Sequence, residues 1–399
     1  MKFKNLFQRS LLILGILIFS NLVPKAQTLS NQAEISLLTC SPGEELYSLF
    51  GHSAIRVKDP KKNMDWVFNY GTFNFRTPNF YMKFARGKLN YMLSVTQFNR
   101  FKRTYIAENR SIIEQKLNLD SLSRQELFIA LIDNAQEANK YYKYDFLFDN
   151  CSTRVRDIVE KNPNSPVAFN SQLQNSAKTF WNLLDPYMED SRWIYLGIHL
   201  ALGQPCDQKA TPYQYMFLPD HMMNAFAIAK IKQNDTLIPL AQKPVVLYNA
   251  QPISNPTKWY QRPLVLFSCL ALLLLWLTVR MIRKKKAIFW PDTLLFGFIG
   301  LLGWFIFFLW FLTDHLATGP NWSIFWAFPL HFPISLLLLR KKRKTWIRYY
   351  FLTHFVVLIL IIGAWPILPQ TFPVAILPIL AIMTLRCLFI FKKYQPTLS

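Results

Sequence analysis

The C-terminal third of the chain consists mostly of apolar residues, and this feature ties it to a membrane. A helix that crosses a bilayer needs about 20 consecutive apolar residues, and the stretch 263–391 contains several such runs between short polar loops. We predict five spans, at 263–279, 291–312, 324–339, 351–368 and 372–391. This part of the chain is therefore expected to form an all-α, five-helix transmembrane domain.

The loops between these spans predict the orientation in the membrane. Loop 280–286 (RMIRKKK) contains five Lys or Arg residues and loop 340–348 (RKKRKTWIR) contains six, whereas the alternate loops TDHLATGPNWS and WPILPQTFP contain none. Because cytoplasmic loops are enriched in Lys and Arg, residues 27–262 are expected to lie outside the cytoplasm. Much of the formal net charge of +22 lies beside the spans, so bilayer topology accounts for it without a nucleic-acid partner.

The N-terminus carries an independent export signal. Lys2, Lys4 and Arg9 precede an apolar stretch at Leu11–Phe19, and the sequence PKAQ offers a cleavage site after Ala26. A positive segment, a short apolar segment and a small-residue cleavage site are the three parts of a secretion signal. We therefore predict a signal peptide over residues 1–26, with an uncleaved anchor as the alternative.

These signals together predict a periplasmic domain over 27–250 and a transmembrane domain over 263–391, in a multi-pass protein of the inner membrane. The exported part contains three cysteines, Cys40, Cys151 and Cys206. An odd number leaves at least one thiol unpaired in a single chain. A bridge between Cys40 and Cys206 is possible, and nothing in the sequence tests it.

Cys151 has the most distinctive setting of the three. It lies in YDFLFDNCSTRVRDIVE (144–160), and apolar residues recur after it at helical spacing, at Val155, Ile158 and Val159. This pattern predicts a helix that begins at the thiol, where the helix dipole and free amides stabilise a thiolate. Asn150 and Arg154 flank the thiol and are candidate substrate-binding residues. The alternative is a structural cysteine that packs at the start of a helix.

A nucleophilic thiol needs a base, and His52 has the most suitable setting. It precedes a predicted strand in GHSAIRVKD, and a second strand in DWVFNYGTFNF (65–75) is expected to pair with it as a hairpin. Asn69 or Tyr70 on the second strand would then hold the far ring nitrogen of His52, the third role in a Cys-His site. His199 lies in an apolar run and is expected to be a buried helix residue, and His221 is expected at a helix start.

These motifs resemble a known family. GHSAIRV followed by FDNCSTRVRDIV resembles the circularly permuted papain-like superfamily, in its lecithin:retinol acyltransferase-like branch. Together with LLTCSPGEELYSLF, FNYGTFNF, FARGKLNYML and YMFLPDHMMNAF, they resemble the Lnb-type lipoprotein N-acyltransferases of Bacteroidetes. The resemblance implies an α+β papain-like catalytic domain, in which an antiparallel sheet carrying His52 packs on a helix headed by Cys151.

The resemblance also implies a reaction. Cys151 would be the nucleophile and His52 the base, and an acyl chain would pass from a phospholipid through a thioester to the free amine of a diacylglyceryl-cysteine lipoprotein. The sequence contains no convincing metal-ligand cluster and no Gly-rich phosphate loop, so no metal or cofactor is expected. Two alternatives stay open: a cysteine hydrolase of the envelope (a phospholipase or a cell-wall peptidase or amidase) and a non-enzymatic membrane sensor.

Three further positions carry expectations of their own. Lys83 and Arg86 lie among aromatic residues in the stretch 78–105, a composition that suits a lipid headgroup interface or an ordinary solvated face. The pair Asp314 and His315 follows the second span and is expected to line a substrate entrance. Arg386 lies near the cytoplasmic end of the last span, where it is expected to snorkel to the interface.

Overall fold

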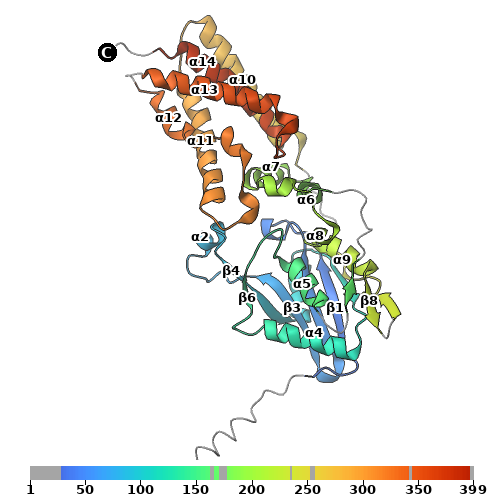
Figure 1. Cartoon of the computed structure of the whole chain (residues 1–399). Coiled ribbons are helices and arrows are strands. Elements are labelled where there is room, and N and C mark those ends of the chain that lie inside the picture. The colour runs from blue at the N-terminus through green and yellow to red at the C-terminus, as the bar shows by residue number, and fades with distance from the viewer. Residues whose placement is uncertain are drawn as a thin grey trace, which may run out of the picture.

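The computed structural model describes residues 28–161, 166–169, 178–233, 236–251, 257–340 and 344–395. The signal peptide expected over residues 1–26 lies outside these ranges. The described chain forms a sheet-rich N-terminal domain and a helical C-terminal domain, which meet end to end (Figure 1). The sequence predicted an α+β domain followed by an all-α domain, and the structure agrees with this order.

A seven-stranded sheet forms the centre of the N-terminal domain. Its strand order is β10-β5-β1-β2-β3-β4-β6, and all neighbours are antiparallel. The strands are β1 Glu34–Cys40, β2 His52–Asp59, β3 Met64–Thr72, β4 Asn90–Gln97, β5 Ile112–Lys116, β6 Tyr141–Lys143 and β10 Val245–Tyr248. A smaller sheet holds β7 Val167–Ala168, β8 Lys230–Gln233 and β9 Thr236–Pro239. The predicted hairpin that begins at His52 is confirmed as β2 and β3.

Helices cover both faces of the large sheet, as the alternation of its side chains requires. One face packs its residues, such as Ile55 and Phe68, against α5 Cys151–Glu160, with α4 Ser121–Asn134 and α9 Pro219–Ile228 around it. On the other face, Ala54 and Val67 pack against α3 Phe98–Ala107. The N-terminus of α5 therefore lies against the central strands β2 and β3.

A third group of elements connects the sheet domain to the membrane domain. It consists of α6 Phe180–Leu184, α7 Arg192–Ala201 and α8 Pro212–Tyr215, around a core of their own that contains Trp181. His199 is buried in α7, as expected, where it stacks on Trp181 and bonds Asp185. His221 lies in the first turn of α9, as expected.

The membrane domain contains four long apolar helices among the described residues: α10 Pro263–Arg283, α11 Trp290–Phe311, α13 Thr345–Gly363 and α14 Leu377–Lys393. The third predicted span, 324–339, differs from the expectation. It is divided between a 3₁₀ turn at Trp322–Phe325 and the short helix α12 His331–Leu337. Pro329 lies between the two pieces, and proline disrupts a helix because it lacks an N–H donor and clashes with the preceding turn.

The divided segment packs directly on a row of glycines in α11. A Cβ atom on Gly300 would come within 2.1 Å of the Phe332 nitrogen, and one on Gly303 within 1.9 Å of the Ala327 oxygen. Small residues allow backbones to approach closely inside a membrane. The glycine row therefore holds the divided segment against α11.

Arg386 does not snorkel, and that prediction is wrong. Its side chain is 1% exposed and bonds both carboxylate oxygens of Asp292, at 2.6 and 2.5 Å, and the hydroxyl of Thr278 at 2.7 Å. These partners lie on α11 and α10, so the arginine of α14 joins three helices. A buried charge of this kind needs a charged partner, which Asp292 supplies.

The loop after α11 joins the two domains. Gly203 N–H donates to Ala317 O at 2.8 Å, Gln204 N–H to Pro320 O at 2.8 Å, and the Asn321 side-chain amide to Leu200 O at 2.9 Å. The same loop reaches α2 Phe80–Ala85 on its other side (Figure 1). The loop is therefore held between α2 and the end of α7.

Candidate active site

The helix α5 begins at Cys151, which confirms the predicted position of the thiol at a helix N-terminus. Asn150 caps the helix: its side-chain oxygen accepts the N–H groups of Ser152 and Thr153 at 2.9 and 3.0 Å, and its N–H donates to the Thr153 hydroxyl at 2.8 Å. The Asn150 side-chain nitrogen donates to the carbonyl of Phe217 at 2.9 Å. Both ends of this amide are therefore engaged in holding the helix start in place.

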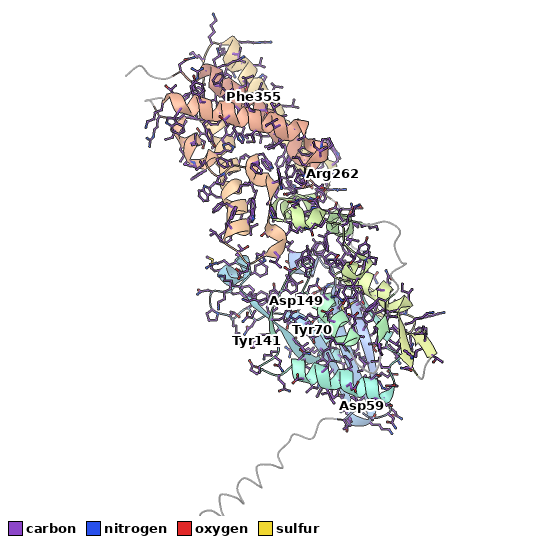
Figure 2. All side chains as sticks on the ribbon, in the orientation of Figure 1. Asp59, Tyr70, Tyr141, Asp149, Arg262 and Phe355 are labelled. Carbon is purple, nitrogen blue, oxygen red and sulfur yellow. The ribbon has the colours of Figure 1, made fainter. Side chains whose placement is uncertain are left out.

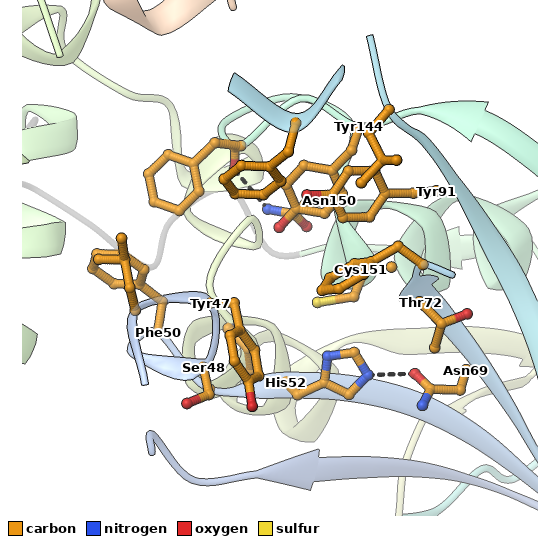
Figure 3. A pocket seen from close by; sticks show the side chains of 18 of the residues that line it. Tyr47, Ser48, Phe50, His52, Asn69, Thr72, Tyr91, Tyr144, Asn150 and Cys151 are labelled. Atoms are coloured by element: carbon orange, nitrogen blue, oxygen red, sulfur yellow. Dashed lines mark hydrogen bonds between the residues drawn. The ribbon is translucent and has the colours of Figure 1, made fainter. Parts of the chain in front are cut away.

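His52 begins β2 and lies beside the thiol. Its Nε2 bonds the side-chain oxygen of Asn69 at 2.5 Å, and the ring also hydrogen-bonds Cys151. Figure 3 shows the second ring nitrogen turned toward the sulfur and away from Asn69. Because the Asn69 oxygen can only accept, it fixes a proton on Nε2 and leaves Nδ1 to exchange a proton with the thiol.

A glycine makes this meeting of strand and helix possible. Gly71 has φ +82°, and the pairing of β3 with β4 shifts between Asn69 and Thr72. A Cβ atom on Gly71 would lie 3.4 Å from Cys151 Cβ and 3.9 Å from His52 Cε1. The left-handed backbone favours glycine, and a bulge of this kind redirects side chains at a site.

The electrostatics of the pair favour an ion pair. Burial would raise the pKa of Cys151, but the positive His52 ring with its hydrogen bond, the Ser53 N–H and the Ser152 hydroxyl together lower it below its ordinary value. Burial would lower the pKa of His52, but the Cys151 charge, the bond to Cys151 and the Asn69 oxygen raise it. Both shifts act in the direction of a thiolate beside an imidazolium, the reactive form of a cysteine nucleophile.

The other two cysteines of the periplasmic domain lack these features. Cys40 and Cys206 are both free and buried, in separate cores, so they do not pair. Burial raises the pKa of Cys40 to about 12 and raises that of Cys206 as well. Thiols with raised pKa values are poor nucleophiles.

The thiol opens into a cavity of about 830 Å³, within the size range of small-molecule sites. Its wall is mostly apolar and includes aromatic side chains such as Phe73, Phe75, Tyr91, Tyr144 and Phe146, whereas Arg100, Thr104, Glu108 and Arg110 contribute polar groups. Residues of α7 and His315 of the membrane domain complete the wall. His315, one of the two residues expected at a substrate entrance, lines the cavity, whereas the N–H of Asp314 donates to Arg86 O at 2.9 Å.

Several candidate residues lie away from the reacting atoms. Tyr70 packs in the core on the opposite face of β3, with its ring 6.4 Å from that of Tyr142. Successive residues of a strand point to opposite faces, so Asn69 and Tyr70 cannot both reach His52. Arg154 pairs with Asp149 and covers the Tyr142 ring.

The two basic candidates on the α2 segment also lie outside the cavity. Lys83 lines a separate cleft of about 200 Å³. Arg86 is the residue at the C-terminal end of α2, and its carbonyl oxygen accepts the N–H of Asp314. The neighbouring residues Phe84 and Gly87 line the cavity instead.

Sequence reasoning missed two contributors to the site. The Ser53 N–H helps to lower the pKa of Cys151, and the Ser53 hydroxyl lies 3.0 Å from that of Ser152. Nothing in the local pattern distinguishes Ser53 from other strand serines. Gly71 did carry a signal, because a glycine inside a strand marks a bulge or a close approach.

Comparison with known families agrees with this arrangement. Residues 21–185 match the model of the Lnb N-terminal periplasmic domain, and residues 255–396 match the model of the Lnb transmembrane domain. No curated protein and no solved structure matches the chain. The two domain matches suggest a lipoprotein-processing membrane enzyme. The chain therefore belongs to the Lnb family, with its N-terminal domain in the periplasm and its C-terminal domain in the membrane.

Proposed function

We propose that this protein transfers an acyl chain from a phospholipid to the free N-terminal amine of a diacylglyceryl-cysteine lipoprotein, through a thioester on Cys151. The observation that carries the proposal is a thiol of lowered pKa, hydrogen-bonded to a histidine, inside a largely apolar cavity whose wall includes a residue of the membrane domain. Apolar walls suit acyl chains, and a wall shared with the membrane domain suits a substrate that resides in a bilayer.

In the first step, the Cys151 thiolate attacks the ester carbonyl of the phospholipid. The carbonyl carbon gains the C–S bond and loses the C–O bond, and His52 gives its Nδ1 proton to the leaving lysophospholipid hydroxyl. The N–H groups of Ser152, Thr153 and Arg154 are all bonded to Asn150. The Cys151 N–H makes no hydrogen bond among the described residues, so it is the candidate donor to the oxyanion.

In the second step, the lipoprotein amine attacks the thioester carbonyl. The C–N bond forms, the C–S bond breaks, and Cys151 leaves as a thiolate. His52 Nδ1 takes the proton that the amine loses, which restores the ion pair. Asn69 holds the ring in one orientation through both steps, because its oxygen bonds Nε2 and not the reacting nitrogen.

The polar end of the cavity suits the phosphate of the donor. Arg110 is 4% exposed, its Nε bonds Ser41 O at 2.9 Å and its Nη1 bonds Glu108 at 2.9 Å. Its Nη2 is buried and has no partner among the described residues. An unpaired guanidinium nitrogen is costly when buried, and a phosphodiester oxygen would satisfy it.

The site also supports a circularly permuted papain-like fold. The chain order is His52 on β2, Asn69 on β3 and Cys151 at the start of α5. In papain-like enzymes the cysteine heads a helix and the histidine lies on the packed sheet, with the cysteine first in the chain. The order His, Asn, Cys is a rotation of the papain-like order Cys, His, Asn, which is what a circular permutation produces.

The test uses purified full-length protein in detergent with an acyl-labelled phospholipid and a synthetic diacyl lipopeptide. Mass spectrometry is expected to find acyl-Cys151 without the lipopeptide and triacyl product with it. Cys151→Ala should abolish both, whereas Cys269→Ala, which removes an exposed thiol of α10, should retain both. Free fatty acid released at the same rate with and without lipopeptide, and no triacyl product, would assign a hydrolase instead.

A further inference from the structure

The segment around α2 exposes large apolar side chains beside the cavity. Tyr81 is 82% exposed, Phe75 66% and Met82 59%. Phe75 and the half-exposed Phe84 also line the cavity. We call these four residues the entrance lip. Side chains of this size usually lie buried, and a cluster of them beside a site marks a contact surface.

The entrance lip is attached to the membrane domain. Arg86 O accepts the N–H of Asp314 at 2.9 Å, and a Cβ atom on Gly87 would lie 3.2 Å from the His315 nitrogen. Phe311 and Leu312, at the end of α11, are also exposed. Figure 1 shows α2 beside this end of α11. Exposed apolar side chains therefore lie both at the end of α11 and on the adjoining entrance lip.

The charges around the entrance lip have one sign. Lys83, Arg86 and Lys88 lie within or just after it, and the stretch 76–107 contains no Asp or Glu. Apolar and aromatic side chains flanked by Lys and Arg are typical of segments that lie in the headgroup region of a bilayer. A partner protein would instead need complementary acidic groups and a shaped surface.

A second segment beside the cavity also exposes large apolar side chains. Leu46 and Tyr47, in the 3₁₀ turn Leu46–Ser48, are 60% and 63% exposed and line the cavity. The Tyr47 ring lies edge-on to Phe73, with centroids 6.5 Å apart. Phe73 in turn contacts Phe75 of the entrance lip, with centroids 5.0 Å apart, so the exposed aromatic side chains of the two segments are joined through one ring.

We propose that the entrance lip lies in the headgroup region of the periplasmic leaflet and that lipid acyl chains pass there from the bilayer straight into the cavity. The proposed membrane contact is argued from the exposed apolar side chains of the entrance lip, the positive charges around it and its junction with α11. Only the use of the admitted lipid as acyl donor rests on the proposed function. The route shortens the passage of the acyl chain through water, because apolar side chains lie at the end of α11, on the entrance lip and in the cavity wall.

Photocrosslinking tests the contact without any catalysis. Full-length Cys151→Ala protein would carry p-benzoylphenylalanine in place of Tyr81 or, as the control, in place of Leu122, in vesicles of phosphatidylethanolamine and phosphatidylglycerol. Leu122 is 58% exposed and lies on α4, which Figure 1 shows on the side of the sheet domain away from the helical bundle. A phospholipid adduct is expected at position 81 and not at 122. No adduct at 81, or equal adducts at both, would overturn the proposal.

A second test measures whether phospholipid reaches Cys151 by way of the entrance lip. In the double variant Tyr81→Ser/Met82→Ser, acylation of Cys151 from vesicle phospholipid should fall about tenfold, since two apolar side chains no longer hold the lip in the bilayer. Alkylation of Cys151 by iodoacetamide, a small soluble reagent, should keep its rate. The control Leu122→Ser/Ile129→Ser should behave as wild type in both. Unchanged acylation in the lip variant, or an equal loss of alkylation, contradicts the route.

The two proposals fail in different ways. If the protein proves to be a hydrolase, fatty-acid release replaces transfer to the lipopeptide, but the adduct at position 81 and the slower acylation of the lip variant persist. If the lip does not contact lipid, the adduct is absent while transfer by the wild-type protein continues.

Discussion

Replacing Asn69 by alanine removes the oxygen that holds the far side of the His52 ring. The bond from His52 Nε2 to this oxygen is 2.5 Å long and stabilises the charged form of the ring. Hydrogen bonds to charged groups contribute about 1.5–3 kcal/mol, and every 1.36 kcal/mol is tenfold in rate, so transfer should fall by about 10- to 150-fold. Asn69→Asp keeps an acceptor oxygen and should restore most of the rate.

The pH dependence separates this role from a merely structural one. The pKa of Cys151 is lowered and that of His52 is raised, and both shifts widen the pH range in which a thiolate can face an imidazolium. Asn69→Ala should lower the pKa of His52 and, because the ion pair is then weaker, raise that of Cys151. The pH range in which a thiolate can face an imidazolium should therefore narrow from both ends. Asn69→Asp should move the upper limit to higher pH.

The assay follows alkylation of Cys151 by iodoacetamide across the pH range, with the modified peptide quantified by mass, alongside the rate of acyl transfer. An Asn69→Ala protein with the wild-type pH midpoint and the wild-type rate would refute the role assigned to Asn69. A loss of rate that Asn69→Asp fails to recover, with an unchanged midpoint, would assign Asn69 to packing alone.

Two other substitutions test features of the fold. Gly71→Ala should destabilise the protein by about 1–2 kcal/mol, because alanine is strained at a left-handed φ, and should lower the transfer rate, because the added methyl group contacts Cys151. Thermal unfolding and the transfer rate measure the two effects, and an unchanged melting temperature would contradict the first. Arg386→Met alone leaves Asp292 buried without its partner, at a cost of about 3–5 kcal/mol, whereas Arg386→Met combined with Asp292→Leu should recover most of the lost stability. The fraction of protein that stays monodisperse after heating in detergent measures the stability of both variants. A single variant as stable as wild type would contradict the reasoning.

The sequence predicted the parts of the site that depend on local pattern. Helical spacing after Cys151 placed the thiol at a helix start, and the strand pattern after His52 placed the base on a hairpin. Asn69 and Tyr70 stayed equivalent because the choice between them depends on the hairpin register. In the structure Ile55 pairs with Phe68, which puts Asn69 on the His52 face and Tyr70 on the other.

The membrane domain shows more clearly which features a hydropathy pattern does not predict. Four of the expected spans are long helices, but the third is divided, because Pro329 interrupts it and its backbone packs on Gly300 and Gly303. Arg386 appeared to be a free charge near an interface because its partner, Asp292, is 94 positions away in the chain. Pairings across such separations are set by tertiary packing, which a single sequence does not display.

The junction between the two domains has a thermodynamic consequence. His315 and the end of α7 form part of the cavity wall, and the loop that carries His315 is hydrogen-bonded to Gly203 and Gln204. A molecule that fills the cavity therefore touches both domains at once, so its binding and the docking of the domains are reciprocally linked. Occupancy stabilises the docked arrangement, and a substitution deep in the helical bundle that loosens docking weakens substrate binding to the extent that it populates the undocked arrangement.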